Sequence, residues 1–223
     1  MTGSQARRRV VASAVDVVEV VEEPLLRLEA GEALVKLSVS GVCGSDKAGV
    51  HGELVFMGPP YYPGHEVVGV VEAVGEGASV VRAGDRVTVE PTLPCGRCKP
   101  CLHKAENLRE NLQFFGCGYR EDGIADVLTE PAQRLYRFPQ ELTDHEAALI
   151  ELLATAVHAV RLAGHLKAKA VAVLGSGTIG LLTLLVARQA AARRVVSTDM
   201  LATNESSRPS SVQRPWWTPA HPS

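Results

Sequence analysis

Three residues far apart in the sequence have side chains that bind transition metals. Cys43 opens the run Cys-Gly-Ser-Asp, His65 lies in the run Gly-His-Glu, and Glu151 follows much later. A thiolate, an imidazole and a carboxylate can together hold Zn²⁺ and leave one position open. A zinc ion with an open position polarises the oxygen of a bound alcohol and lowers its affinity for a proton. These residue types therefore point to a catalytic zinc site.

A second group of thiols lies in the middle of the chain. Cys95, Cys98 and Cys101 are separated from one another by two residues. Three thiolates at this spacing can wrap around one metal ion. The alternative is three free thiols in an exposed loop, which oxidise easily. Cys43 and Cys117 are the other two cysteines, and the spacing of the five favours a metal over a disulfide framework.

A glycine-rich run is typical of a dinucleotide-binding turn. Gly175-Ser176-Gly177-Thr178-Ile179-Gly180 follows an apolar stretch and opens a helical pattern, which is the context that this motif requires. The first glycine permits a tight turn, the second lets the backbone approach a pyrophosphate, and the third lets helix and strand pack closely. The amino end of the helix then faces the phosphates with its partial positive charge.

Asp199 ends the next expected strand, about twenty residues after this turn. A carboxylate there accepts hydrogen bonds from the ribose hydroxyls and repels a 2′-phosphate. Asp199 therefore favours NAD over NADP as the cofactor. The alternative is an ordinary turn residue at the end of a strand.

The elements that must position these residues fall into regions that differ in hydrophobic pattern and composition. Residues 10 to about 138 contain short alternating or apolar runs, at 33–39, 67–74 and 86–89, separated by glycine-rich turns. Strands at this spacing predict an all-β, barrel-like domain over residues 1–138.

In residues 139–201 the apolar residues recur at the spacing of helices and buried strands. A capping box at Thr143–Glu146 opens a helix that runs to about residue 162. A fully buried strand is expected at 170–174, a helix at 179–191 and a strand at 194–197. This order predicts one βαβ unit, whereas a dinucleotide-binding fold has about six strands, so the expected nucleotide-binding domain is partial.

The last residues, 202–223, are rich in proline, serine and tryptophan. Without periodicity they are predicted to be disordered. Their abrupt change of texture suggests a shifted reading frame or an aberrant stop, and therefore a truncated chain with little or no dehydrogenase activity.

Composition excludes several other classes of protein. The 223 residues are 46% hydrophobic and 22% charged, with a formal net charge of −2, which argues against a nucleic-acid-binding surface. No apolar stretch is long enough for a signal peptide or a membrane span. A reducing, cytoplasmic setting is the simplest interpretation.

The two short motifs and the glycine-rich turn, in this order, resemble the zinc-containing medium-chain dehydrogenases/reductases, over roughly residues 10–201. The run Leu149-Ile150-Glu151 is similar to the sorbitol-, threonine- and butanediol-dehydrogenase-like branch of the alcohol dehydrogenase family. The resemblance implies a mixed β and α/β fold, with a GroES-like β-barrel catalytic domain followed by a Rossmann βαβ unit. Members of the family are homo-oligomers.

The resemblance also implies roles for individual residues. Cys43, His65 and Glu151 would be ligands of the catalytic zinc, with Glu66 as an exchanging ligand. Ser45 would take the proton of the alcohol. Asp46 would orient His65 through the ring nitrogen that does not bind the metal. The implied reaction is hydride transfer between NAD and a secondary alcohol or polyol.

In the family, the loop of Cys95, Cys98 and Cys101 binds a structural zinc with a fourth cysteine, and that position here is Arg109. An arginine has no lone pair to donate to a metal, so a weakened or absent structural zinc is expected. His103 and Cys117 are candidate substitutes for the missing ligand.

Two other functions compete with the dehydrogenase. One is a non-catalytic fragment that keeps the zinc-binding β-domain. The other is a zinc-free quinone or enoyl reductase of the same architecture, which the combination of Cys43, His65 and Glu151 disfavours.

Overall fold

The computed structural model describes residues 6–55, 57–111, 113–117 and 121–201. The predicted disordered tail, residues 202–223, lies outside the described residues. Contacts within the chain divide it into two compact units between Glu151 and Leu152, and each unit is described by itself. The boundary that the sequence suggests, between residues 138 and 139, stays a prediction.

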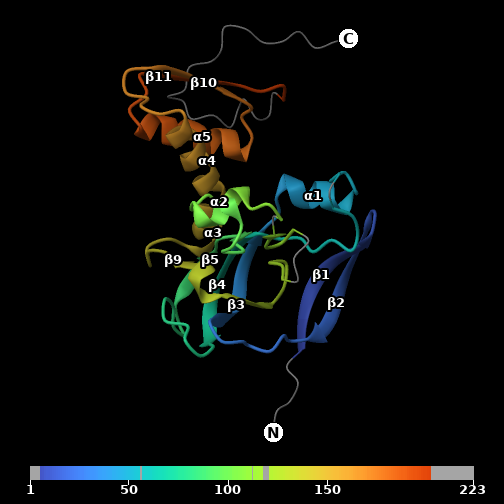
Figure 1. The fold of residues 1–223 in the computed structure, drawn as a ribbon. Coiled ribbons are helices and arrows are strands. Elements are labelled where there is room, and N and C mark those ends of the chain that lie inside the picture. The colour runs from blue at the N-terminus through green and yellow to red at the C-terminus, as the bar shows by residue number, and fades with distance from the viewer. Residues whose placement is uncertain (1–5, 56, 112, 118–120, 202–223) are drawn as a thin grey trace. The chain divides into compact units, whose positions relative to one another are not determined.

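A five-stranded sheet forms the centre of the first unit (Figure 1). All neighbouring strands pair antiparallel. In spatial order the strands are β8 (Val127–Pro131), β3 (Glu32–Gly41), β4 (Glu66–Val74), β5 (Arg86–Val89) and β9 (Leu135–Arg137). The strands expected from the apolar runs at 33–39, 67–74 and 86–89 are therefore present.

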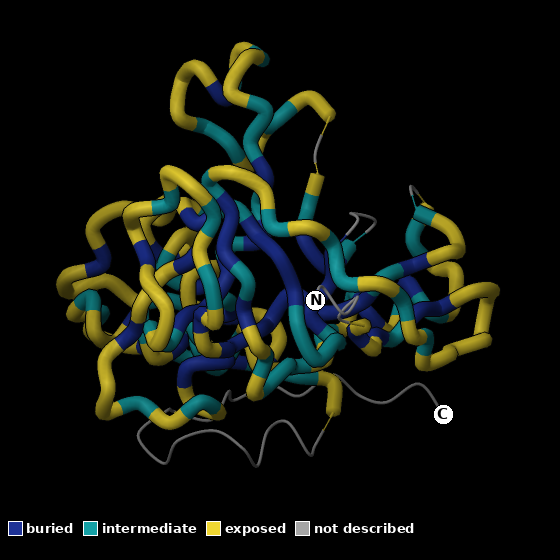
Figure 2. The backbone as a smooth tube through the Cα atoms, turned by 90° about the horizontal axis from the view of Figure 1, so that it is seen from below, coloured by how far each residue is buried: buried dark blue, intermediate teal, exposed yellow. Residues whose placement is uncertain are grey.

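One face of this sheet buries a core of β-branched residues. Val35, Val67, Val71 and Val87 are at most 1% exposed, and Phe115 is fully buried against them. Each buried side chain of this kind stabilises the fold by roughly 1.5–3 kcal/mol through removal of apolar surface from water. Figure 2 shows the buried backbone gathered in the interior, with exposed loops around it.

The remaining elements of the first unit are short. Two strands form a separate hairpin, and two more form a small ladder beside the main sheet. The hairpin strands are β1 (Ala6–Ala14) and β2 (Val17–Pro24), and the ladder strands are β6 (Thr92–Leu93) and β7 (Gln113–Phe114). The helices and 3₁₀ turns are α1 (Gly44–Val50), α2 (Lys99–Leu102), η1 (Glu106–Leu108), η2 (Ala132–Arg134) and α3 (Asp144–Ala147).

The fold class is confirmed, but strand pairing among the described residues does not close the sheet into a barrel. The β1–β2 hairpin touches the rest of the unit through isolated bridges, at Arg9–Ala125 and Ala12–Tyr61, and not through a continuous ladder. The expected barrel is therefore an open sheet with a hairpin beside it.

Charged side chains fasten this hairpin to the segment that precedes β8. Arg7 pairs with Glu121, and Arg9 pairs with Asp122 at 3.0 Å. Glu23 on β2 accepts from Arg7 at 2.7 Å and forms an ion pair with Arg9 at 3.1 Å. Glu121 and Asp122 are fully buried, so the loss of one partner would leave a buried charge uncompensated, which typically costs about 3–5 kcal/mol.

The second unit contains the predicted βαβ arrangement. β10 (Ala170–Leu174) and β11 (Arg194–Thr198) pair in parallel, and α5 (Thr178–Gln189) connects them. Their apolar residues pack with residues from α4 (Ile150–Leu162) around Leu184 and Ala187, which are fully buried. The expectation that 170–174 is fully buried was wrong: Val173 is 8% exposed but Leu174 is 83% exposed, because the described residues cover only one face of this two-stranded sheet.

The capping box at Thr143 is confirmed, since the Thr143 side chain accepts from the Glu146 amide while Glu146 accepts from the Thr143 amide at 2.8 Å. The expected single helix is divided into α3 and α4. No helix in the described ranges is both long and apolar enough to cross a membrane.

Burial makes Asp122 a pH-sensitive member of the charged cluster. Desolvation raises its pKa to about 7, although Arg9 and Arg7 attract its charged form. An aspartate in an unfolded chain has a pKa near 4, so the folded protein binds this proton more tightly. The free energy of unfolding should therefore fall between about pH 4 and pH 7 and lose no more from this group above pH 7.

Asp122→Asn should remove that part of the pH dependence. The measurement is the urea midpoint at several pH values between 4 and 8, with Glu19→Gln on the exposed face of β2 as the control. An unchanged slope in Asp122→Asn would contradict the assignment.

Candidate metal centre

The sheet register brings the first metal-binding motif to the second. Gly41, the last residue of β3, pairs with Glu66, the first residue of β4. Cys43 lies two residues after β3 as the N-cap of α1, and His65 directly precedes β4. Antiparallel pairing therefore places the two loops at the same end of the sheet, although they are far apart in the sequence.

Three of the predicted ligands form one group. The sulfur of Cys43, a ring nitrogen of His65 and a carboxylate oxygen of Glu66 all lie within 4.8 Å of one another. His65 is 5% exposed and Glu66 is 7% exposed. Burying an imidazole and a carboxylate is costly unless they are paired or bind a metal. Sulfur, nitrogen and oxygen donors at this spacing fit Zn²⁺.

Asp46 connects the loops that carry these ligands. One of its carboxylate oxygens accepts from the Cys43 amide at 2.8 Å, and the other accepts from the Gly64 amide at 3.0 Å. The second oxygen also accepts from the Tyr61 hydroxyl at 3.3 Å. Asp46 is 2% exposed, so these bonds are shielded from water.

The expected contact between Asp46 and His65 is an electrostatic approach and not a hydrogen bond. The Asp46 carboxylate is 3.6 Å from Nδ1 of His65, and this buried nitrogen makes no hydrogen bond with the described residues. Asp46 therefore holds the backbone on either side of the site, while its charge faces the imidazole.

Close packing fixes the turn that carries His65. Gly64 has a φ of +106°, and a Cβ at this position would lie 2.6 Å from the Ile124 amide nitrogen. The ring of Phe114 packs edge-on against His65, with 5.5 Å between centroids. These contacts leave His65 little freedom, because both its backbone and its ring are enclosed.

Glu151, the other predicted ligand, lies in the first turn of α4 and is not part of the group of three. Burial raises the pKa of Glu151, the charges of Glu66 and Asp46 raise it further, and His65 opposes them. Glu151 therefore shares the electrostatic environment of the group. Ser45 is half-buried in the first turn of α1, two residues from Cys43.

Cys117 and Tyr61 belong to this neighbourhood, and the sequence did not indicate it. The Cys117 sulfur lies 3.7 Å from the Met57 sulfur. Burial raises the pKa of Cys117, and the charges of Asp46 and Cys43 add to the effect while a hydrogen bond with Tyr61 opposes it. Cys117 is therefore beside the Cys43 group, and it is not among the residues grouped with Cys95, Cys98 and Cys101.

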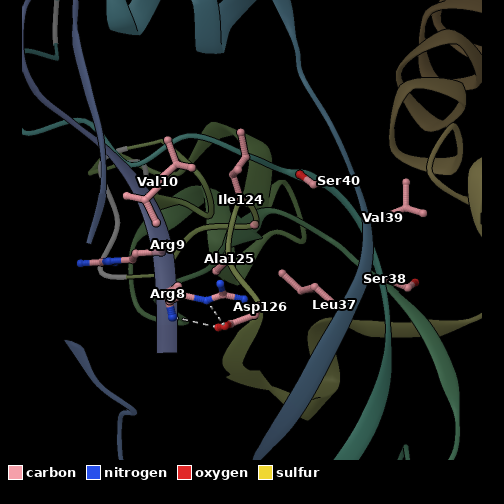
Figure 3. Close-up of a pocket in the computed structure, with 12 residues that line it drawn as sticks. Arg8, Arg9, Val10, Leu37, Ser38, Val39, Ser40, Ile124, Ala125 and Asp126 are labelled. Atoms are coloured by element: carbon pink, nitrogen blue, oxygen red, sulfur yellow. Dashed lines mark hydrogen bonds and ion pairs between the residues drawn. The ribbon is translucent and has the colours of Figure 1, made fainter. Parts of the chain in front are cut away.

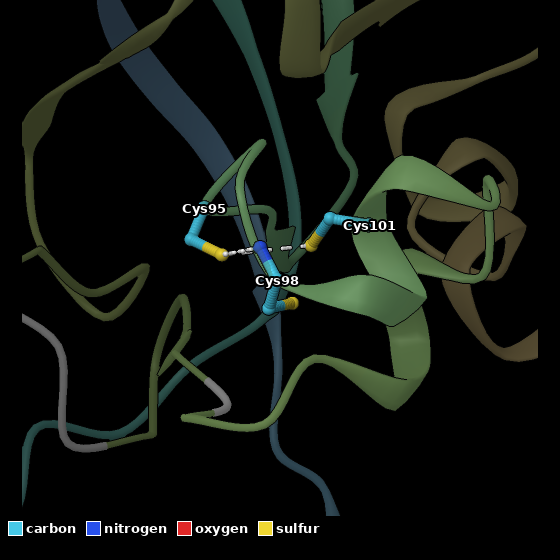
Figure 4. A group of neighbouring side chains, drawn as sticks. All are labelled: Cys95, Cys98 and Cys101. Atoms are coloured by element: carbon cyan, nitrogen blue, oxygen red, sulfur yellow. Dashed lines mark hydrogen bonds between the residues drawn. The ribbon is translucent and has the colours of Figure 1, made fainter.

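The second thiol group is also assembled. The sulfurs of Cys95, Cys98 and Cys101 lie within 4.8 Å of one another. The Cys95 thiol has a pKa lowered to about 6, because the backbone N–H groups of Arg97 and Cys98 point at its sulfur. Figure 4 shows the Cys95 sulfur joined to both the Cys98 amide and the Cys101 sulfur.

A hollow of about 300 Å³ elsewhere in the first unit contains none of the predicted ligands. Figure 3 shows Leu37, Val39 and Ile124 beside it, with the ion pair of Arg8 and Asp126 at one side. Half of its lining residues are aliphatic and none carries a thiol or an imidazole, so it is not the candidate site.

The glycine-rich turn lies where the βαβ unit requires it, between β10 and α5. Gly177 is the N-cap of α5, and a Cβ on Gly180 would overlap the carbonyl oxygen of Gly175. Asp199 follows β11, and its carboxylate accepts from the Ser176 amide at 2.6 Å. The structure therefore brings Asp199 to the predicted turn.

The fold agrees with one known family. Residues 29–140, half of the chain, match the alcohol dehydrogenase GroES-like domain. The chain belongs to the zinc-dependent medium-chain dehydrogenases. D-xylulose reductase A of Aspergillus oryzae (strain ATCC 42149 / RIB 40) is 35% identical over 181 residues, which are 79% of this chain and 50% of that protein. The chain spans about half the length of the curated relatives that it matches.

Solved structures of other dehydrogenases have the same fold. Galactitol-1-phosphate dehydrogenase from Escherichia coli superposes with a TM-score of 0.81 at 30% identity, over 88% of this chain and 57% of that one. A structure described as a zinc-binding dehydrogenase from Sinorhizobium meliloti 1021, bound to NADP, gives a TM-score of 0.83 at 33% identity, over 90% and 58%.

His65→Ala should lower the zinc content of the purified protein by up to one ion per chain. It removes a ligand, and losing even outer-shell partners of a metal costs about 10–100-fold in affinity. The measurement is metal content after dialysis against a weak chelator. His51→Ala is the matched control, because His51 is half exposed and pairs with Asp16. Equal zinc in both variants would exclude His65 as a ligand.

Proposed function

We propose that this protein is a zinc-dependent oxidoreductase that transfers a hydride between a secondary alcohol or polyol and a nicotinamide dinucleotide. The observation that carries the proposal is the group of half-buried Cys43 with buried His65 and Glu66, and with Asp46 bonded to the loops on both sides. The named relatives that reduce xylulose or oxidise galactitol phosphate support a polyol substrate.

The residues would divide the work as follows. Cys43 and His65 would hold the zinc, with Glu66 and Glu151 as the carboxylates that approach it. Bound there, Zn²⁺ would lower the proton affinity of the substrate hydroxyl, and the nicotinamide would accept the hydride. Ser45, half-buried in the same loop, would receive the hydroxyl proton and pass it to solvent.

The cofactor would bind at the turn before α5. Backbone N–H groups at the amino end of this helix present partial positive charge to a pyrophosphate. The Asp199 carboxylate lies at the same turn, where it would accept hydrogen bonds from the ribose and repel a 2′-phosphate. This arrangement supports NAD, whereas the related structure from Sinorhizobium meliloti 1021 contains NADP.

Ser45→Ala should reduce turnover by about 100-fold or more, because positioned proton transfer contributes about 10²–10⁴-fold. The assay is NADH fluorescence from the zinc-loaded protein with xylitol or 2,3-butanediol at high enzyme concentration. Ser79→Ala, in an exposed turn after β4, is the control and should match the unmodified protein. Equal rates in the two variants would exclude Ser45 from proton transfer.

The same assay separates the dehydrogenase from the non-catalytic alternative. Zinc bound at the Cys43 group with no NADH formed from any polyol would favour a zinc-binding protein without catalysis.

Asp199→Ser should shift cofactor preference toward NADP by at least about tenfold, since it removes the charge that opposes a 2′-phosphate. The ratio of the dissociation constants for NAD and NADP, measured by calorimetry, tests this independently of turnover. Asp144→Ser, whose carboxylate pairs with Arg86, is the control. An unchanged ratio in Asp199→Ser would remove Asp199 from cofactor selection.

A further inference from the structure

The thiol group of Cys95, Cys98 and Cys101 has the geometry of a metal site (Figure 4). The sulfurs of Cys95 and Cys101 are 3.8 Å apart, whereas a disulfide requires about 2.05 Å. With Zn–S bonds of about 2.3 Å, two sulfurs on one tetrahedral ion are also about 3.8 Å apart. The separation therefore suits two corners of a tetrahedron around one ion.

The local backbone holds the thiols in this arrangement. Cys98 is the N-cap of α2, and its amide donates to the Cys95 sulfur at 3.3 Å. Cys101 lies within α2 and is buried. An amide that points at a sulfur favours its thiolate form, which is the form that binds metals.

No fourth ligand joins this group among the described residues. His103 is turned to the Lys99 carbonyl oxygen, with its Nδ1 at 2.8 Å from that atom. Glu106 pairs with Arg134 at 2.9 Å. Cys117 lies beside Cys43 and Met57, as described above.

Arg109 contacts the strand before the loop but cannot complete the site. Its guanidinium donates to the carbonyl oxygen of Leu93, two residues before Cys95. A guanidinium stays protonated and has no lone pair to donate. The side chain that follows the loop therefore braces its backbone and adds no ligand.

We propose that this loop binds one zinc ion through three thiolates and leaves the fourth position to an exchangeable small ligand. Water would occupy that position, and a nitrogen base or a soluble thiol would displace it. The site would thus be open to solutes, whereas a four-thiolate zinc site is closed. The proposal concerns a different group of ligands from the Cys43 centre and does not depend on catalysis there.

The test is ¹¹³Cd NMR of the whole protein loaded with cadmium, because the chemical shift reports the number of sulfur ligands. Cys98→Ser identifies the signal of this loop by its loss, and His65→Ala identifies that of the other centre. The loop signal should lie in the three-sulfur range and move when imidazole is added. In Arg109→Cys it should move to the four-sulfur range and no longer respond to imidazole.

Zinc release gives a second readout. Transfer of zinc from this loop to a chromophoric chelator should be at least about tenfold slower in Arg109→Cys than in the unmodified protein. The reason is that even the loss of a group outside the ligand shell lowers metal affinity by about 10–100-fold, and a fourth thiolate adds a direct ligand. Lys104→Cys, which places a thiol at an exposed position of the same loop, is the matched control and should not slow it.

Two results would overturn the proposal. A four-sulfur signal from the unmodified protein that ignores imidazole would mean that another thiol closes the site. Absence of cadmium from the loop would also overturn it, whether all three thiols stay reduced or two of them form a disulfide that leaves the third reactive. Both results come from the unmodified protein, so they stand even where a variant does not fold.

Discussion

The candidate metal centre depends on one buried carboxylate. Asp46 accepts from the Cys43 amide and the Gly64 amide, which belong to loops at the ends of different strands. Hydrogen bonds to an ionised group contribute about 1.5–3 kcal/mol, and a buried donor left without its partner costs a further desolvation penalty. Without Asp46 the two amides would lose their common acceptor. The ligand group is therefore a consequence of this bridge as much as of the ligands themselves.

The sheet provides the coarse placement that the bridge refines. The pairing of Gly41 with Glu66 sets the ends of β3 and β4 level, so the residues just outside these strands must meet. A shift of one residue would turn Glu66 to the opposite face of the sheet. The buried valines on β3 and β4 oppose such a shift, because it would move them from the core to solvent. Core packing thus fixes the register, and the register fixes the distance between the ligands.

The sequence predicted the parts of this arrangement that depend on local pattern. Alternating and apolar runs predicted β3, β4 and β5, the capping residues predicted α3, and the glycine spacing predicted the turn before α5. It did not predict the pairs of Arg7 with Glu121 and of Arg9 with Asp122, since charged residues in a strand are ordinarily exposed. The alternation of buried Arg7 and Arg9 with exposed Arg8 becomes informative only when the partner carboxylates are known. The exposure of β10 was missed for a similar reason, because burial depends on how many elements cover a strand.

The two thiol-containing groups differ in how much chain entropy is lost when their residues are brought together. Cys95, Cys98 and Cys101 lie within seven consecutive residues, so a single loop and the short helix α2 bring them together at little cost in chain entropy. Cys43, His65 and Glu66 meet only when β3 and β4 are paired and Asp46 is buried, so metal binding there would be coupled to the folding of the whole sheet. The buried polar atoms of His65 and Glu66 would lower the stability of the fold if they bound no metal ion. The two residues lie at the end of the sheet, outside its apolar core. A bound ion would turn the cost of burying them into a net stabilisation of the folded state.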